Sequence, residues 1–157
     1  MYTTHRSKKQ RIIACLKCIP ALLVLAMIFN FSSATSEEST EESNVITKAI
    51  VEIAHIEIDD ATLSVIDDMV REMAHFTEYF ILGITCCLAL SGFCMGVRTR
   101  NIGLGIFCVL YAVSDEIHQY FVPGRCFQLQ DILVDSMGAI TAIFIWWLCN
   151  RKAYLPA

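Results

Sequence analysis

The stretch DEIHQYFVPGR, at residues 115–125, places two adjacent acids, a glutamine and an arginine between two long apolar runs. IGLGIFCVLYAVS precedes it at 102–114, and SMGAITAIFIWWLC follows at 136–149. Charged side chains are costly inside apolar membrane helices, and they usually face the interior of the helix bundle. The stretch therefore predicts a helical bundle with a polar site between its helices.

The rest of the chain repeats the apolar pattern. Its 157 residues are 55% hydrophobic with a mean hydropathy of +0.53, and this length suits one domain. Apolar runs of about 18 residues or more predict membrane-spanning helices. Four such runs occur, at 12–31, 74–95, 101–122 and 131–150. We therefore expect an all-α integral membrane protein with four transmembrane helices.

Three groups of basic residues predict the orientation of these helices. The groups stand before the first run, between the second and third, and after the fourth: Arg6, Lys8, Lys9 and Arg11; Arg98 and Arg100; Arg151 and Lys152. Four spans put all three groups on one side of the membrane, which the positive-inside rule identifies as the cytoplasm. Both termini are then cytoplasmic, and the acids from Glu37 to Asp135 lie outside or in the outer half of the membrane.

The first run and the cysteines each allow a second interpretation. A basic head, an apolar run and the sequence SSA at 32–34 resemble a signal peptide with a cleavage site. The run is longer than a usual signal core, so we favour a retained anchor. Cys15 and Cys18 imitate a redox or zinc pair. Because seven of the eight cysteines fall in predicted spans, we expect small buried side chains and no disulfide framework.

The segment between the first two runs predicts surface structure. SSATSEESTEESN, at 32–44, is acidic and rich in serine, as in an exposed linker. Asp59 and Asp60 with Thr62 could start a helix. Two sets of apolar residues at helical spacing predict two short amphipathic helices on the outer surface: Ile46, Ile50 and Ile53, then Leu63, Ile66, Val70 and Met73. Packing of these faces on the protein's own outer end is an equal alternative.

These segments divide the chain into four parts. They are an N-terminal tail with the first transmembrane helix (1–36), an extracytoplasmic acidic linker and amphipathic segment (37–73), a three-helix core (74–150) and a cytoplasmic tail (151–157). Gly138 and Ala142 form a small-xxx-small pair, which predicts a close helix contact in the core.

Polar residues at the outer ends of three helices predict a pocket that opens outward. Their spacing puts them on converging helix faces, and an arginine in the outer loop hangs over them. The candidates are His75, Glu78 and Tyr79; Asp115, Glu116 and Gln119; Arg125; and Asp131 and Asp135. His118 falls off the shared face and is excluded.

Each candidate also has a structural interpretation. Asp131 could be an N-cap of the fourth helix, and Arg125 could be an interfacial anchor or the ion-pair partner of Asp131 or Glu116. His75 could be a satisfied core histidine. The convergence of five acids, one histidine and one arginine favours a functional site, and a purely structural ion network is the alternative.

The same residues carry a family resemblance. REMAHFTEY at 71–79, DEIHQYFVPGR at 115–125 and the pattern Asp-x-x-x-Asp-x-x-Gly at 131–138 closely resemble segments of the VanZ-like membrane proteins. Those carry His-Phe-x-x-Tyr, Asp-Glu-x-x-Gln-x-Phe-x-Pro-x-Arg and Asp-x-x-x-Asn-x-x-Gly. The matching residues are His75, Phe76, Tyr79, Asp115, Glu116, Gln119, Phe121, Pro123, Arg125, Asp131 and Gly138. Asp135 departs from the pattern, because the family often has Asn there. The resemblance covers residues 70–147.

The resemblance implies a bacterial, multi-pass protein of the cell envelope. The founding member of the family is associated with resistance to the glycopeptide antibiotic teicoplanin. No chemical mechanism comes with the family, so the function of the pocket has to be argued from its residues.

Three hypotheses stay open. In the first, the pocket binds the headgroup of a lipid or of a lipid-linked cell-wall precursor. Arg125 would contact a phosphate of the headgroup, and the acids would hold Arg125 and bind hydroxyls or an amine. In the second, the protein is an enzyme: the acids and His75 hold a divalent cation, or Glu116 is a general acid or base. In the third, the protein is structural. The expected partner is a membrane lipid or lipid-linked precursor and not nucleic acid, and the oligomeric state stays open.

Overall fold

The computed structural model describes residues 7–55, 58–93 and 95–150, and this part of the chain is helical apart from short connections. Arg6, Cys94, Arg151 and Lys152, and the expected tail at 151–157, lie outside the described residues. The all-α class is confirmed. The described helices are α1 (Lys8–Leu16), α2 (Ile19–Ser32), α3 (Ser36–Ala54), α4 (Asp60–Ser91), α5 (Val97–Tyr120) and α6 (Leu129–Asn150).

The first apolar run forms two helices instead of one. α1 ends at Leu16, and α2 begins at Ile19 with Pro20 in its first turn. Proline has no backbone N–H and its ring clashes with the carbonyl four residues earlier, so a continuous helix breaks here. The ammonium group of Lys17, at the break, donates a hydrogen bond to Ser91 Oγ at the end of α4 (3.2 Å). The break is therefore tied to the bundle.

The linker expected at 32–44 is wrong for most of its length, because α3 begins at Ser36. Thr35 Oγ1 accepts the backbone N–H of Glu38 (3.3 Å), and the Glu38 carboxylate accepts the backbone N–H of Thr35 (2.8 Å). Such a reciprocal capping box stabilises a helix N-terminus, and acids in the first turn favour the helix dipole. The composition indicated a linker, but the local pattern Thr-x-x-Glu starts a helix.

The second amphipathic helix is not a separate element. α4 runs for 32 residues, through both the amphipathic segment and the second apolar run. Its start agrees with the prediction, because the Asp59 carboxylate accepts the backbone N–H of Thr62 (2.9 Å). No glycine or proline interrupts 60–82, so nothing in the sequence ends the helix at the expected boundary near residue 73.

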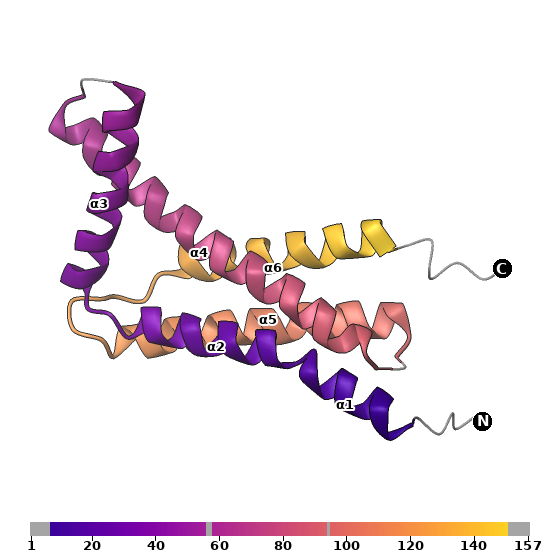
Figure 1. The fold of residues 1–157 in the computed structure, drawn as a ribbon. Coiled ribbons are helices and arrows are strands. Elements are labelled where there is room, and N and C mark those ends of the chain that lie inside the picture. Colours follow the sequence, from indigo (N-terminus) through magenta and orange to yellow (C-terminus); the bar gives the residue numbers. More distant parts are fainter. Residues whose placement is uncertain (1–6, 56–57, 94, 151–157) are drawn as a thin grey trace.

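α4 is the central helix of the fold and contacts each of the other five helices (Figure 1). α3 and the first part of α4 form a hairpin that projects from one end of the bundle, which we call the hairpin end. α1 and α5 begin and α6 finishes at the opposite end. We call this the basic end, because Lys8, Lys9, Arg11 and Arg98 lie there. The passes made by α1–α2, α4, α5 and α6 thus alternate in direction.

Small residues bring α4 and α6 together. A Cβ on Gly138 would overlap the Phe76 carbonyl oxygen, and a Cβ on Gly83 would lie 2.8 Å from Ala139 O and from Ala142 Cβ. The close contact predicted from Gly138 and Ala142 is confirmed, with Gly83 as its partner on α4. Beside this crossing lies a core that includes the fully buried side chains of Ile28, Leu82, Cys87 and Cys108. The seven cysteines in the described part of the chain are free thiols.

Three segments of the described chain are long and apolar enough to cross a membrane: Lys8–Ser32, Asp60–Ser91 and Leu129–Asn150. α5 is not among them, although a span was expected at 101–122. It carries Arg98 and Arg100 in its first turn, and Asp115 and Glu116 near its other end. Arg100, Asp115 and Glu116 are buried in the protein.

Candidate functional site

Two adjoining cavities lie at the hairpin end of the bundle, among α3, α4, α5 and the loop at 121–128. Their volumes are about 230 and 150 Å³. Glu78 lines the larger cavity and Asp131 the smaller. Both cavities share the lining residues Ser39, Arg71, His75, Gln119 and Arg125, so they are two parts of one space, which we call the polar hollow.

Asp115 joins α5 to α2 beside the polar hollow. Its Oδ1 accepts a hydrogen bond from the Ser32 hydroxyl (2.5 Å), and its Oδ2 accepts one from the Gln119 amide (3.4 Å). All three side chains are buried. Asp115 does not line the hollow, whereas Ser32 and Gln119 do. The carboxylate therefore positions lining residues through neutral donors.

Arg125 reaches into the hollow from the loop. Its Nε donates to the backbone oxygen of Ala34 (3.0 Å), and its Nη1 donates to Gln119 Oε1 (3.3 Å). The pairing with Asp131 or Glu116 suggested by the sequence is wrong. Among the described residues, no carboxylate lies within ion-pair distance of the Arg125 guanidinium.

The charge of Arg125 is therefore poorly compensated. Burial, followed by the nearby guanidinium of Arg71, lowers the pKa of Arg125 from its usual value, and Asp115, Asp131 and Glu116 oppose this effect. A guanidinium nevertheless stays protonated in proteins. A bound anion would relieve the cost of keeping this positive charge half-buried near a second arginine.

Glu116 and Asp131 have different surroundings. Glu116 is buried, and its Oε1 accepts the backbone N–H of Gln128 (2.5 Å), which fixes the loop to α5. Glu116 does not line the polar hollow. Asp131 lies in the first turn of α6 and not at its N-cap, and it lines the smaller cavity. Of these two acids, only Asp131 faces the space that a ligand could enter.

His75 lines both cavities and lies against α6. Its Nδ1 is 3.4 Å from Asp135 Oδ1, which is ion-pair distance, but the contact lacks hydrogen-bond geometry. Tyr79 is fully buried one turn further along α4, and its hydroxyl makes no hydrogen bond within the described residues. His75 can therefore act at the hollow with a carboxylate behind it, while the Tyr79 ring lies beside Tyr111 of α5, with 6.2 Å between centroids.

His118 lies outside the site, on the side of α5 that faces α2. Its ring stacks on Phe29 with 4.7 Å between centroids, and its Nε2 is 3.1 Å from Ser33 Oγ. Neither cavity includes it.

The metal site considered from the sequence is not assembled. In the described part of the chain, no three histidine, cysteine, aspartate or glutamate side chains gather as ligands for a metal ion. Asp115, Glu116 and Asp135 instead contact different partners: a serine, a backbone N–H and His75.

Sequence reasoning missed Ser32, Ser39 and Arg71 as residues of the site. Arg71 carried a signal, since it is four residues before His75 on the same helix face. Ser32 and Ser39 lie in the segment that was predicted to be a linker. No pattern in that segment indicates that the α2–α3 junction folds over the hollow.

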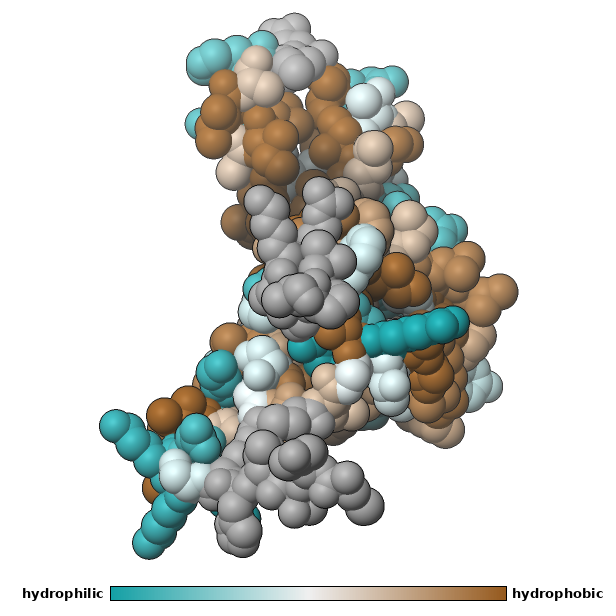
Figure 2. All heavy atoms as spheres, turned by 90° about the vertical axis from the view of Figure 1, so that its right-hand side faces the viewer, coloured by the Kyte–Doolittle hydropathy of each residue, from teal (hydrophilic) through white to brown (hydrophobic). Residues whose placement is uncertain are grey.

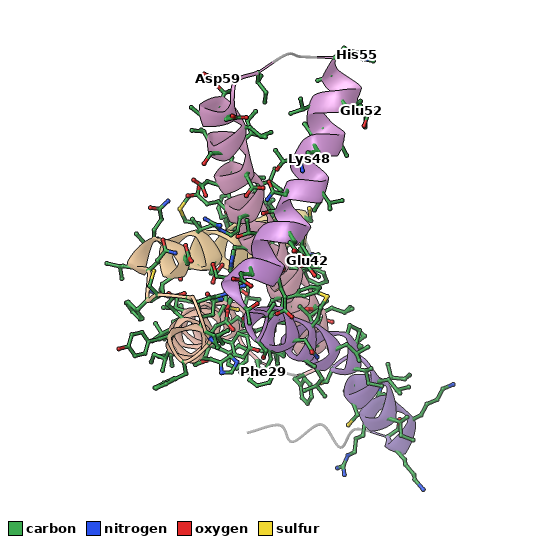
Figure 3. All side chains as sticks on the ribbon, turned by 90° about the vertical axis from the view of Figure 1, so that its left-hand side faces the viewer. Phe29, Glu42, Lys48, Glu52, His55 and Asp59 are labelled. Carbon is green, nitrogen blue, oxygen red and sulfur yellow. The ribbon has the colours of Figure 1, made fainter. Side chains whose placement is uncertain are left out.

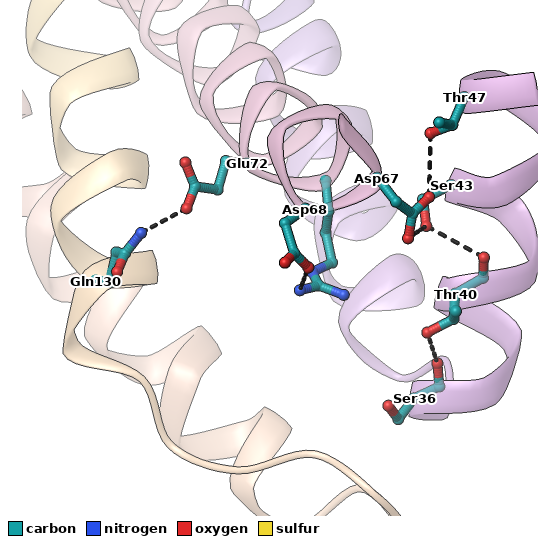
Figure 4. A network of polar contacts seen from close by, with 9 residues as sticks. Ser36, Thr40, Ser43, Thr47, Asp67, Asp68, Glu72 and Gln130 are labelled. Atoms are coloured by element: carbon teal, nitrogen blue, oxygen red, sulfur yellow. Dashed lines mark hydrogen bonds and ion pairs between the residues drawn. The ribbon is translucent and has the colours of Figure 1, made fainter. Parts of the chain in front are cut away.

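The hairpin is held by a buried polar cluster (Figure 4). The Asp67 carboxylate accepts hydrogen bonds from the hydroxyls of Ser43 (3.0 Å) and Thr47 (3.1 Å), and all three side chains are buried. Figure 3 shows α3 from the side opposite to the basic end, with Glu42, Lys48 and Glu52 along it. These three side chains are exposed.

The apolar stripes of the hairpin face a space between its two helices. It has a volume of about 540 Å³, and we call it the apolar groove. Ile53, predicted to share the apolar face of α3, is 79% exposed and does not line it. The apolar faces of the two helices are not fully covered by other parts of the protein. The alternative that these faces pack on the protein's own outer end therefore holds only in part. The groove is lined by Ile46, Ile50, Ile66, Met69, Val70, Met73, Ala74, Thr77 and Glu78.

Long apolar helices around a polar hollow define a class of all-helical proteins suited to a membrane. The chain belongs to the VanZ/LLP1 family, whose model matches residues 18–150. The match includes α2 and α3, which the motif resemblance did not cover. No curated protein and no solved structure matches the chain.

Proposed function

We propose that the chain is an integral membrane protein that crosses a bacterial cell membrane four times, with its basic end in the cytoplasm. Large apolar side chains are exposed around the bundle, including Leu22 (62%), Leu110 (63%) and Met137 (61%), and such surfaces suit contact with lipid. α5 supplies the one pass that hydropathy alone does not indicate, because its acids and Arg100 are buried within the protein. The positive-inside rule supports the orientation.

The first helix is retained in this proposal. Ser32 bonds Asp115, and the Ala34 carbonyl accepts from Arg125. A cleavage after SSA would remove both contacts from the hollow. Thiol labelling of a single cysteine at position 40, in a cysteine-free variant, should occur in intact cells. Labelling only after lysis would contradict the orientation.

Within this topology, the polar hollow binds the phosphate-containing headgroup of a lipid or lipid-linked cell-wall precursor in the outer leaflet. The observation that carries this proposal is Arg125, a half-buried guanidinium held by two neutral acceptors and facing Arg71 across the hollow. Guanidinium groups suit bidentate contact with phosphate. Glu78 and Asp131 are placed to bind hydroxyls or an amine of the same headgroup.

The proposal includes resistance to teicoplanin-type glycopeptides, and only the family supports this part of it. A protein that holds a precursor headgroup would change how the precursor is presented to the antibiotic. Expression of the parent and of Arg125→Gln in a sensitive bacterium should then give different teicoplanin susceptibility.

Thermal melting in detergent tests the headgroup site with inorganic phosphate as the probe, against chloride at equal ionic strength. A ligand that binds only the folded state stabilises it by about 2.7 kcal/mol at a hundred times its dissociation constant. We expect phosphate to raise the melting temperature of the parent and not of Arg125→Gln. Arg125→Lys should show a smaller rise, because lysine keeps the charge but lacks the planar fork.

Arg98→Gln is the matched control, since Arg98 is an exposed arginine at the basic end of the bundle. It should keep the full effect of phosphate. An equal rise for the parent and Arg125→Gln would remove the basis of the proposal.

A second candidate is acid–base catalysis at the same headgroup, which the placement of His75 favours. A histidine that faces a cavity and has Asp135 behind its ring resembles the pair that orients a general base. His75→Gln should then abolish turnover of a bound lipid phosphate while the effect of phosphate on melting remains.

A further inference from the structure

The apolar groove continues directly from the polar hollow. Ile46, Val70, Ala74 and Glu78 line both the groove and the larger cavity of the hollow. The groove's volume of about 540 Å³ falls within the range of ligand-binding pockets, roughly 300–1,000 Å³. A polar and an apolar space that share one border are suited to a ligand with a polar head and an apolar chain.

The walls of the groove are exposed to an unusual degree for apolar side chains. Ile50 is 47% exposed, Met69 61% and Met73 60%. Figure 2 looks onto the molecule from the basic end, and it shows brown, apolar side chains over both helices of the hairpin. In the proposed topology this surface faces the membrane, so a lipid chain can enter the groove sideways from the outer leaflet.

A buried polar contact joins the two helices of the hairpin. It is formed beside the groove through Asp67, which is buried with Ser43 and Thr47. Bulky isoleucine and methionine side chains keep the remaining faces apart, since neither α3 nor the first part of α4 contains a glycine.

We propose that the apolar groove holds a hydrocarbon chain of the same lipid whose phosphate binds in the polar hollow. This inference rests on the proposed function and narrows the ligand to an anionic lipid with a phosphate headgroup and an extended chain. Arg71 and Arg125 lie at the headgroup end, Glu78 lies at the border between the two spaces, and Ile50, Met69 and Met73 lie along the chain.

Photolabelling of the full chain tests the inference. The protein is placed in phosphatidylcholine vesicles with a trace of phosphatidic acid that carries a diazirine at the end of one acyl chain. We expect the label on peptides of the hairpin more than on the exposed faces of α2, α5 and α6. Ile50→Asn should lower hairpin labelling by about tenfold, the factor that corresponds to removing one buried aliphatic side chain from contact.

Ile53→Asn is the matched control. Both changes replace an isoleucine of α3 one turn apart, but Ile53 does not line the groove. Ile53→Asn should label like the parent, and melting temperatures in detergent should show that both variants fold. Equal loss of label in the two variants, or even labelling of all exposed apolar faces in the parent, would overturn the groove assignment.

Two further measurements, with excess inorganic phosphate and with Arg125→Gln, distinguish the lipid chain in the apolar groove from the phosphate site in the polar hollow. Both should lower hairpin labelling if one lipid occupies both spaces. Loss of label with Arg125→Gln but not with Ile50→Asn would overturn the groove alone. Labelling that survives Arg125→Gln and excess phosphate would overturn the headgroup site as well as the single-ligand arrangement. A dimer that Ile50→Asn dissociates would assign the groove to a second copy and would also overturn the inference.

Discussion

The two halves of α4 pack in opposite ways. In its second half, Gly83 lets the helix approach α6 so closely that no side chain separates the backbones at Ala139. In its first half, Ile66, Met69 and Met73 stand opposite α3 across an open groove. Small residues thus make a fixed contact within the bundle, while bulky residues line an open groove in the hairpin, whose two helices are joined by one buried aspartate. Open space is found where the helices are kept apart.

The largest effect is expected at the close crossing. Gly138→Ala places a methyl group against the Phe76 carbonyl, which belongs to the backbone and cannot rotate away. Overpacking of this kind costs about 1–3 kcal/mol, occasionally more, and we expect the upper end of that range. The measurement is thermal melting in detergent, together with accumulation of the protein in membranes.

Gly103→Ala and Gly105→Ala are the controls for this prediction. Both glycines lie on α5, and a Cβ on either meets nothing within 4 Å. Alanine is favoured over glycine in a helix by about 1 kcal/mol, so these variants should be as stable as the parent or more so. If Gly138→Ala melts at the same temperature as these controls, α4 and α6 are less tightly packed at Gly138 than their short backbone distance indicates.

A smaller effect is expected in the hairpin. Asp67→Ala removes the acceptor of the buried Thr47 hydroxyl and leaves Ser43 Oγ with the Thr40 carbonyl alone (3.2 Å), and an unsatisfied buried polar group costs about 1–3 kcal/mol. Because the hairpin projects from the bundle, the cost should appear as faster amide hydrogen exchange in α3 and not in α6.

Asp68→Ala is the neighbouring control. Asp68 forms only a surface ion pair with Arg71 (2.8 Å), and such pairs contribute at most about 1 kcal/mol. Exchange in α3 should stay close to that of the parent. Uniform acceleration over α3 and α6 in Asp67→Ala would show that the hairpin and the bundle unfold as one unit.

The features of the fold that could be predicted were the long apolar runs and the close helix contact at small residues. Three of the four expected spans match segments long and apolar enough to cross a membrane, and Gly138 with Ala142 located the crossing. Errors arose where a local signal outweighed composition. Pro20 broke the first run, and the Thr35–Glu38 capping box converted a predicted linker into α3. α5 was ambiguous because its charged residues are buried by tertiary contacts.

The sequence predicted several residues that line the site, but not the groups to which they form hydrogen bonds. Helical spacing put His75 and Gln119 on converging faces, the outer loop put Arg125 over them, and all three line the polar hollow. Their partners depended on segments that spacing does not connect. Asp115 bonds a serine of α2, and Arg125 bonds a carbonyl at residue 34, about ninety positions away in the chain. Only the folded backbone brings these groups together.

The smallest expected effect concerns the start of α3, where the fold departs most from its prediction. Hydrogen bonds from the Thr35 backbone N–H and hydroxyl lower the pKa of Glu38 from its usual 4.5. A carboxyl whose pKa is lower in the folded state stabilises that state above its unfolded pKa, and the contribution is lost as the pH falls through the folded pKa. Amide protection in the first turn of α3 should therefore decrease below pH 4.5 in the parent. Glu38→Gln should remove this pH dependence, and Thr35→Ala should lower protection at every pH because the cap itself is lost. Glu37→Gln changes a neighbouring acid of the same turn and should keep the dependence. If the parent and Glu38→Gln respond alike to acid, the helix start depends on composition and packing instead of on the capping box.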